Sequence, residues 1–197
     1  MAEMNPVPVT LDGRHVRLEP LAMSHAEDLA VAGADPSIWR YMFDAITDLD
    51  SARAYVGAAM ALADKGLAVP FATIDKASGR AVGSTRFANI DRANRRLEIG
   101  WTWIAPAFQR TPVNTEAKYL QLRHCFETLH CIRVELKTDS LNEKSRAAIL
   151  RLGAQQEGIF RNHMIMADGR RRHSVYFSII DSDWPAVKAR LEARLAA

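Results

Sequence analysis

Glu98 is the side chain whose type and surroundings point most clearly to chemistry. In the segment 96–104 every second residue from 97 onward is large and apolar: Leu97, Ile99, Trp101 and Trp103. This period-two pattern predicts a strand with one face on the core, which leaves Glu98 on the polar face. A carboxylate that is partly buried there has a raised pKa and suits general acid–base work. A half-exposed glutamate paired with Arg95 or Arg96 is the alternative, and both interpretations stay open.

A turn rich in hydrogen-bonding groups follows this strand. Pro106 ends the strand, and from Asn114 onward apolar residues return at the spacing of an amphipathic helix: Leu122, Cys125, Phe126 and Leu129. The turn QRTPVN, residues 109–114, therefore lies at a helix N-terminus. Unpaired N–H groups and the positive end of the helix dipole meet there, which favours a phosphate or pyrophosphate. An ordinary capped helix is the alternative for a turn taken by itself.

A second polar segment lies further along the chain, in SLNEKSRAAILRLGAQQEG, residues 140–158. Ser140 and Glu143 have the spacing of a capping box, which predicts a helix start. Asn142 and Ser145 are three residues apart and so share one helix face. A solvated helix face is the alternative to a functional pair.

These segments together resemble the GNAT superfamily of N-acetyltransferases. Its signature is a strand, then Q/R-x-x-G-x-G/A, then a helix, and the match begins at Gln109 and Arg110. The chain departs from the signature at Pro112 and Asn114, where the family usually has glycine, or alanine at the second position. The form QRTPVNTEAK is similar to a variant in the branch that includes ribosomal-protein N-terminal acetyltransferases. The family's next landmark is matched by Asn142, Ser145, Leu152 and Gly153.

The resemblance implies acetyl-coenzyme A as the co-substrate. Main-chain groups of Trp103, Ile104 and Ala105 would lie along pantetheine, and Asn142 would contact its amides. The pyrophosphate would lie on the turn formed by Gln109, Arg110, Thr111, Val113, Asn114 and Thr115. Pro112 has no N–H, and a hydrogen bond to a charged group is worth roughly 1.5–3 kcal/mol. Proline nevertheless suits the first turn of a helix, so its effect on the affinity is left open.

The same resemblance implies the catalytic roles. An amine must be neutral to attack a thioester, and the departing thiolate takes up a proton. Glu98 is the candidate general base or amine-orienting group, directly or through a water. Ser145 is the candidate donor to the thiolate or a group that positions the thiol, because the tyrosine that many members use is absent from this helix. Neither cysteine lies in an activating setting, which argues against a covalent intermediate.

By the same resemblance, the acceptor pocket is expected between the loop 38–47 and the hairpin after Glu157. Its candidate residues are Tyr41, Phe43, Arg161 and His163, and His163 would share the proton-accepting role. A hydrophobic lid over the core is the alternative for the aromatic group in that loop. The acceptor is expected to be a primary amine: a peptide N-terminus, an amino acid, a polyamine or an antibiotic amine. A catalytically weak coenzyme A-binding regulatory module is the second functional hypothesis, and a nucleotide binder is disfavoured because G-x-x-x-x-G-K-[ST] is absent.

Composition predicts one domain over residues 1–197. The chain has 48% hydrophobic and 25% charged residues, and a net charge of +3 with a pI near 9.0 is too slight to indicate nucleic acid. The basic cluster 170–173 is expected on a solvated hairpin tip after Asp168–Gly169. Two cysteines make no metal-site pattern. The lack of an apolar run of ~20 residues and of a leader predicts a cytoplasmic protein without a membrane segment, and a homodimer is one expected assembly.

The expected fold class is α+β, with a mostly antiparallel central sheet flanked by helices. By resemblance to GNAT proteins, a bulge splays two central strands. Strands are expected at 9–18 around Asp12–Gly13, 69–74, 81–90, 96–104, 131–137, 159–166 and 173–180. Helices are expected at 24–34 with a Ser24/Glu27 capping box, at 51–65 before Gly66, from Asn114, from Asn142, and at 183–195.

Overall fold

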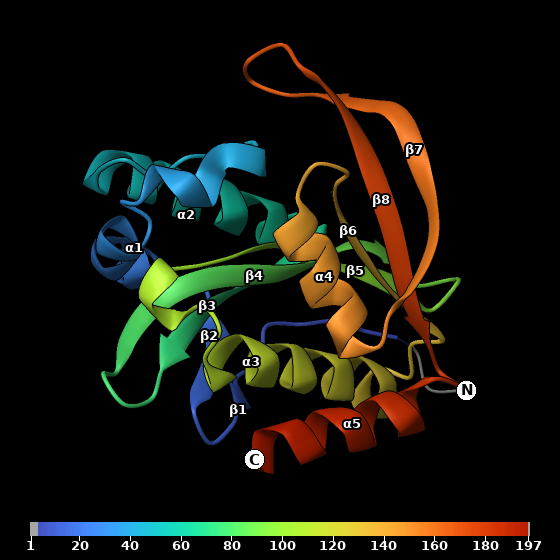
Figure 1. The fold of residues 1–197 in the computed structure, drawn as a ribbon. Helices are drawn as coiled ribbons and strands as arrows, with labels where there is room; N and C mark the ends of the chain where they lie inside the picture. The colour runs from blue at the N-terminus through green and yellow to red at the C-terminus, as the bar shows by residue number, and fades with distance from the viewer. Residues whose placement is uncertain (1–3, 197) are drawn as a thin grey trace.

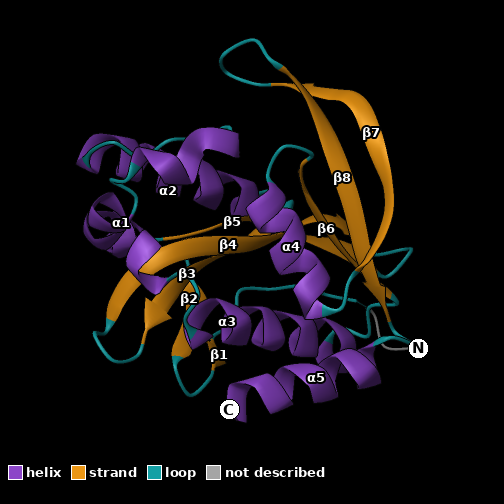
Figure 2. Ribbon diagram, in the orientation of Figure 1, coloured by secondary structure: helices purple, strands orange, loops and turns teal. Residues whose placement is uncertain are grey.

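A computed structural model describes residues 4–196. Its centre is an eight-stranded sheet of order β1-β2-β3-β4-β5-β6-β8-β7, with helices on both faces (Figures 1 and 2). All neighbouring strands are antiparallel except the pair β5–β6, which is parallel. The predicted α+β class with a mostly antiparallel sheet is therefore confirmed.

The strands are β1 (Leu11–Asp12), β2 (Val16–Pro20), β3 (Ala68–Asp75), β4 (Arg80–Asp91), β5 (Arg96–Ile104), β6 (Arg133–Asp139), β7 (Gln155–Ile165) and β8 (Arg171–Ile180). The helices are α1 (Ala26–Ala32), α2 (Leu49–Asp64), α3 (Pro112–Arg123), α4 (Glu143–Leu152) and α5 (Trp184–Ala196). Short 3-10 turns occupy Met23–His25, Pro36–Tyr41 and Pro106–Phe108, and a π-helical turn His124–Thr128 follows α3.

Two apolar cores hold the helices to the sheet. The larger core lies on the face covered by α3, α4 and α5 and includes Leu97 and Ile99. The second core lies under α1 and α2, where Trp39, Tyr55 and Trp103 pack with ring centroids 5.0–6.5 Å apart. In Figure 1, α1 and α2 lie together on one side of the sheet, well apart from α3 and α5.

Strand β5 contributes to both cores because it contains a bulge. Gly100 pairs with Arg86, but Trp103 pairs with Ser84, so β5 has one extra residue in this stretch. Trp101 occupies it with a φ of 49°, in the left-handed region. An extra residue reverses which side chains face which side. The single continuous core face expected for 97–103 is therefore wrong.

Strands β5 and β6 part just after they pair. Their parallel ladder joins only Arg96–Glu98 to Arg133–Glu135, although both strands continue well beyond. Glu98 is at the last paired position and stands at the apex of the opening. The predicted splaying of the central strands is confirmed.

Several helix starts differ from the predictions. Helix α2 begins at Leu49, two residues before the predicted 51, because Asp48 caps it. Helix α1 begins after a 3-10 turn in which His25 Nδ1 accepts the Ala22 N–H at 3.1 Å, so the Ser24/Glu27 capping box does not form. Helix α3 starts at Pro112, two residues before the predicted Asn114, because Thr111 caps it. Helix α4 is capped by Asn142, which replaces the expected Ser140/Glu143 box.

The β7–β8 hairpin extends away from the body of the molecule (Figure 1). It turns at Asp168–Gly169, as predicted, and Gly169 has a φ of 80°. The basic cluster at its tip is not simply solvated, which corrects the expectation. Arg170 pairs with the buried Asp139 at 2.6 Å, and Arg172 is only 6% exposed. Contacts with the rest of the molecule thus bury Arg172 and leave Arg170 partly exposed.

Candidate active site

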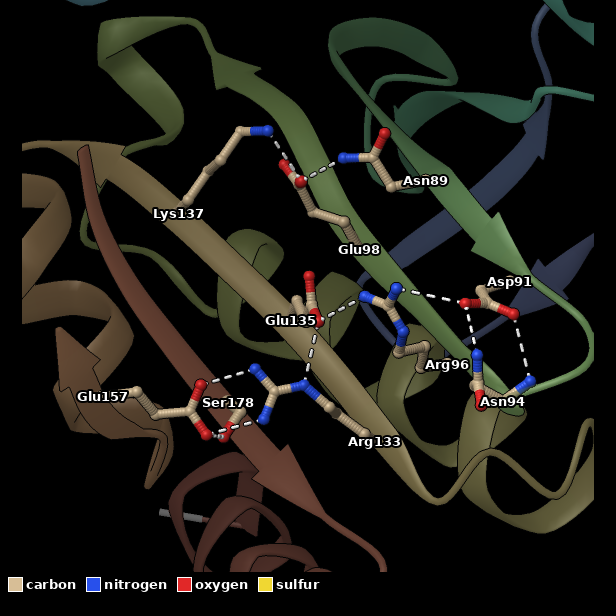
Figure 3. Close-up of polar contacts among 10 residues, drawn as sticks. All are labelled: Asn89, Asp91, Asn94, Arg96, Glu98, Arg133, Glu135, Lys137, Glu157 and Ser178. Carbon is tan, nitrogen blue, oxygen red and sulfur yellow. Dashed lines mark hydrogen bonds and ion pairs between the residues drawn. The ribbon is translucent and has the colours of Figure 1, made fainter. Parts of the chain in front are cut away.

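Glu98 lies buried at the apex of the β5–β6 opening. Its side chain is 2% exposed, and Oε2 lies 2.9 Å from Lys137 Nζ and accepts a hydrogen bond from Asn89 Nδ2 at 2.7 Å (Figure 3). The alternative pairing with Arg95 or Arg96 is wrong. Arg96 instead binds Asp91 and Glu135, at 3.1 and 3.0 Å. Lys137 lies on β6 just past the last paired residues, so its side chain reaches across the opening to Glu98.

The sheet around Glu98 has one apolar and one polar face. On β6 and β8 alternate residues belong to the larger core: Val134, Leu136, Val175, Phe177 and Ile179. The residues between them carry polar groups on the opposite face: Arg133, Glu135, Lys137, Asp139, Arg172, Ser174, Tyr176 and Ser178. The polar face is therefore the side of the sheet toward which Glu98 and the hairpin are directed.

An ion-pair network lies at the base of this polar face. Arg133 makes two contacts to the Glu157 carboxylate, at 2.6 and 2.5 Å, and a third to Glu135 at 2.9 Å (Figure 3). The hydrogen bonds from Arg133 lower the pKa of Glu157 to about 2. A cavity of about 500 Å³ lies beside the network, and its lining includes Asn89, Phe160 and Tyr176. The network fixes the base of the hairpin on the central strands.

Aromatic rings surround Lys137. Its Nζ lies 5.8 Å from the ring centroids of both Trp101 and Tyr176, and Arg86 lies 5.0 Å from the Trp101 ring on β5. The bulge thus turns Trp101 toward two cations, and cation–π attraction stabilises it there.

His163, one of the candidate acceptor residues, belongs to the same cluster. Its Nδ1 lies 3.0 Å from Ser174 Oγ, and its ring packs edge-on against Tyr176 at 5.7 Å. Burial lowers the pKa of His163, and the charges of Lys137 and Arg172 lower it further. The imidazole is therefore favoured in its neutral form, which accepts protons.

The other three predicted acceptor residues are placed differently. Phe43 meets the hairpin, since the Arg172 guanidinium lies 5.4 Å from its ring. Tyr41 is half-buried beside Arg40. Arg161 is exposed and lines a shallow depression together with His163 and His173. The structure thus brings Phe43 and His163 together with the polar face, and Arg161 lies beside His163 in the depression.

The turn before α3 is held by its own side chains. Gln109 Nε2 donates to the Ile104 carbonyl at 3.1 Å, and Gln109 Oε1 accepts from Lys144 on α4. Thr111 Oγ1 donates to the Phe108 carbonyl at 2.7 Å. Arg110 has a φ of 63°, a left-handed conformation for which glycine has less strain. These contacts order the turn next to the open end of β5.

One backbone donor in the first turn of α3 has neither a helix partner nor a capping side chain. The first four N–H groups of a helix have no intrahelical acceptor. Pro112 has no N–H, and the Val113 N–H is directed to Thr111 Oγ1 at 3.4 Å. The Asn114 N–H remains for an anion, because Thr115 is the residue whose N–H makes the first bond of the helix, to the N-cap carbonyl of Thr111. Pro112 thus occupies the position at which proline is best tolerated in a helix.

Asn142 and Ser145 lie where β6 passes into α4. Asn142 Oδ1 accepts the Ser145 N–H at 3.0 Å, so helix capping accounts for their spacing without a functional role. The Lys144–Gln109 contact nevertheless places this helix start beside the turn before α3. The two helix N-termini therefore face a common region at the opening.

Several residues of the site carry signals that are weak in the sequence. Asn89, Lys137 and Arg172 lie on three different strands, and only strand pairing brings them to Glu98 and His163. The alternation of charged and apolar residues along 133–139 is the one local pattern that marks Lys137 as part of a polar face.

Behind the bulge, Lys118 is buried among neutral groups. Its Nζ donates to Thr102 Oγ1, Thr85 Oγ1 and Gln121 Oε1 at 2.7, 3.1 and 3.0 Å. Within residues 4–196 no carboxylate lies at ion-pair distance from it. Burial lowers the pKa of Lys118 to about 7. The lysine ties α3 to the bulged part of β5.

Comparison with known sequences decides the family. The sequence model of the acetyltransferase (GNAT) domain matches residues 15–155. The chain belongs to the GNAT family of acetyltransferases. Membership confirms the predicted class, an acetyl-coenzyme A-dependent N-acetyltransferase. None of the helices in residues 4–196 is both long and apolar enough to cross a membrane, and in that range no three His, Cys, Asp or Glu side chains gather as a metal site requires.

Individual GNAT relatives agree with this assignment. The chain is 34% identical over 110 residues to the putative ribosomal N-acetyltransferase YdaF of Bacillus subtilis (strain 168), a match that spans 56% of the chain and 59% of YdaF. A GCN5-related N-acetyltransferase from Brucella melitensis has a TM-score of 0.92 at 34% identity, over 98% of this chain and 88% of that one. Mycobacterium smegmatis RimJ, solved in complex with CoA-disulfide, has the same fold, with a TM-score of 0.81 at 24% identity over 95% of each chain.

Proposed function

We propose that the protein transfers the acetyl group of acetyl-coenzyme A to a primary amine held on the polar face around Glu98. The observation that carries the proposal is the opening between β5 and β6, with Glu98 at its apex and two helix starts at its mouth. The opening gives the thioester a route between the strands from the side of α3. The amine approaches from the opposite side, beneath the hairpin.

The turn before α3 is the proposed pyrophosphate site. The free N–H group of Asn114 and the positive end of the α3 dipole favour an anion there. The charges of Arg110 and Lys144 add to this field. Pantetheine then lies along the main chain of 103–105, within reach of Asn142. Gln109, Thr111 and Val113 shape the turn and complete the proposed cofactor-binding residues.

Glu98 is the proposed group that orients the amine and receives its proton, directly or through a water. Asn89 and Lys137 fix its carboxylate from two sides. His163, whose pKa is lowered, is a second acceptor for the proton. The neutral amine attacks the thioester carbon, the C–S bond breaks, and the coenzyme A thiolate takes up a proton. Ser145, at the start of α4, is placed to position that sulfur.

Several broader features belong to the same proposal. We assign the whole chain to one catalytic domain that works in the cytoplasm, with Tyr41, Phe43, Arg161 and His163 around the acceptor and with no role for nucleic acid. A homodimer is the assembly to be tested by light scattering. The likeness to YdaF, which is named a putative ribosomal N-acetyltransferase, favours a protein N-terminus as the acceptor amine.

The alternative is a coenzyme A-binding module with little turnover. Calorimetric titration with acetyl-coenzyme A, coenzyme A and ATP, followed by a thiol-release assay over a panel of amines, separates the two. We expect saturable binding of both coenzyme A species and not of ATP, and thiol release with at least one amine. Binding without release by any amine supports the module, and absence of coenzyme A binding overturns both.

A further inference from the structure

Arg172 is a buried cation on the acceptor side of the cleft. It lies on β8, is 6% exposed, and its Nε donates to Ser174 Oγ at 3.1 Å. The guanidinium packs over the ring of Phe43, which comes from the loop after the 3-10 turn Pro36–Tyr41. Arg172 therefore stands where the hairpin meets that loop.

The charge of Arg172 is not balanced by the chain. Within residues 4–196 no carboxylate lies at ion-pair distance from its guanidinium, whereas the nearby Arg170 pairs with Asp139 and Arg133 pairs with Glu157. The two terminal nitrogens of Arg172 have no acceptor among the described residues, and neither is sealed from accessible space. Burying an unpaired charge is costly, and burial is the leading reason that the pKa of Arg172 is lowered.

Arg172 is joined to the catalytic cluster through a shared hydroxyl. Ser174 Oγ lies 3.1 Å from Arg172 Nε and 3.0 Å from His163 Nδ1. The charges of Arg172, Lys137 and Glu98 all act on His163. Lys137 is already paired with Glu98, and Arg86 packs on the rings of Tyr55 and Trp101, so Arg172 is the cation next to His163 that is left for a ligand among the described residues.

We infer that Arg172 binds a carboxylate carried by the acceptor close to its amine, so that the preferred acceptors are peptides or amino acids with an acidic group at that end. This inference rests on the proposed acetyl transfer and names its substrate class. Guanidinium forks match carboxylates with two parallel hydrogen bonds, which fits the two unused terminal nitrogens. The cations Lys137, Arg86, Arg170 and Arg172 outnumber the carboxylates Glu98 and Asp139, so the group has an excess of positive charge that a negatively charged acceptor reduces. The same excess of positive charge disfavours polyamines, which are cations themselves.

Matched dipeptide amides test the inference. The first pair is aspartyl-alanine amide and asparaginyl-alanine amide. The second pair is alanyl-aspartate amide and alanyl-asparagine amide. Each pair differs only in one carboxylate, and amidation removes the terminal one. We expect kcat/KM to be about tenfold or more higher for the acidic member of at least one pair, as a charged hydrogen bond implies. Arg172→Gln should reduce this preference to within about twofold.

Two variants guard against trivial outcomes. Arg171→Gln, at the exposed neighbouring position, should keep the preference, and Arg172→Lys should keep part of it because the charge remains. Thermal melting and coenzyme A titration of Arg172→Gln check folding and the cofactor site. Equal or better use of the neutral peptides, a preference that survives Arg172→Gln, or no acetylation of either acidic peptide overturns the inference. The proposed transfer itself stands if neutral peptides are acetylated, and fails separately if no coenzyme A binds.

Discussion

Glu98 and Lys137 form a buried ion pair across the point where β5 and β6 separate, with 2.9 Å between Oε2 and Nζ. The pair joins two strands that no longer share backbone hydrogen bonds beyond this position. It therefore fixes a carboxylate at the place where we propose that cofactor and amine meet. The following predictions test the parts of this arrangement separately.

Replacing Glu98 by glutamine should lower kcat strongly while the coenzyme A affinity stays nearly unchanged. General-base catalysis is worth about 10²–10⁴-fold, and Glu98 lies away from the turn before α3. Steady-state kinetics over a range of pH and calorimetry give the two quantities. Glu143→Gln, on the exposed start of α4, is the matched control. Unchanged turnover at every pH would remove Glu98 from the mechanism.

Gly100→Ala should impair turnover through Glu98. A Cβ at Gly100 would lie 2.6 Å from Glu98 Oε1, so the carboxylate must move. We expect kcat to fall by about tenfold or more, since small displacements of a catalytic group are costly. Gly57→Ala in α2, where the added methyl meets nothing within 4 Å, is the control and should leave kcat unchanged. Full activity of Gly100→Ala would show that the carboxylate position is not critical.

Pro112→Ala should hold or tighten coenzyme A binding. The substitution restores a backbone N–H at the first position of α3, close to the free donor of Asn114. A donor that reaches the phosphate would lower Kd by up to about tenfold. Calorimetric titration measures the change. A large loss of affinity would instead show that the proline ring shapes the turn.

Ser145→Ala should lower kcat only modestly, by less than about tenfold. The N-cap bond to Asn142 uses the Ser145 backbone N–H, so it survives the substitution and α4 should stay folded. Asn142→Ala removes that bond and should cost about 1 kcal/mol of stability. Kinetics and denaturant unfolding distinguish the two variants. Full activity of Ser145→Ala would show that the Ser145 hydroxyl has no role in the reaction.

Lys118 should make the stability depend on pH. Its pKa is about 7 in the folded protein and 10.5 when exposed, so between these values the unfolded state binds more protons. The cost of burying this charge is therefore full below pH 7 and disappears as the pH rises toward 10.5. Lys118→Met removes that dependence. The unfolding free energy of the variant minus that of the wild type should fall between pH 6.5 and 9.5, and a constant difference would contradict the assignment.

The sequence predicts the local elements of the site well because their signals are local. Spacing marks the strand that carries Glu98, and the return of helical periodicity marks the turn before α3. The bulge at Trp101 is not visible, because the apolar alternation from 97 to 103 reads as uninterrupted. The sequence does not predict Lys137 and Arg172 as part of the site, because their contacts depend on the register of strands far apart in the chain. The capping role of Asn142 was hidden by the equally suitable Ser140.

The reversal of faces along β5 has a consequence for folding. Leu97 and Ile99 belong to one core and Trp103 to the other, so a single strand is shared by both halves of the molecule. Neither half can lose its packing without withdrawing side chains from the same strand. We therefore expect amide hydrogen exchange to report one cooperative opening for both sides of the sheet, rather than two separate local ones.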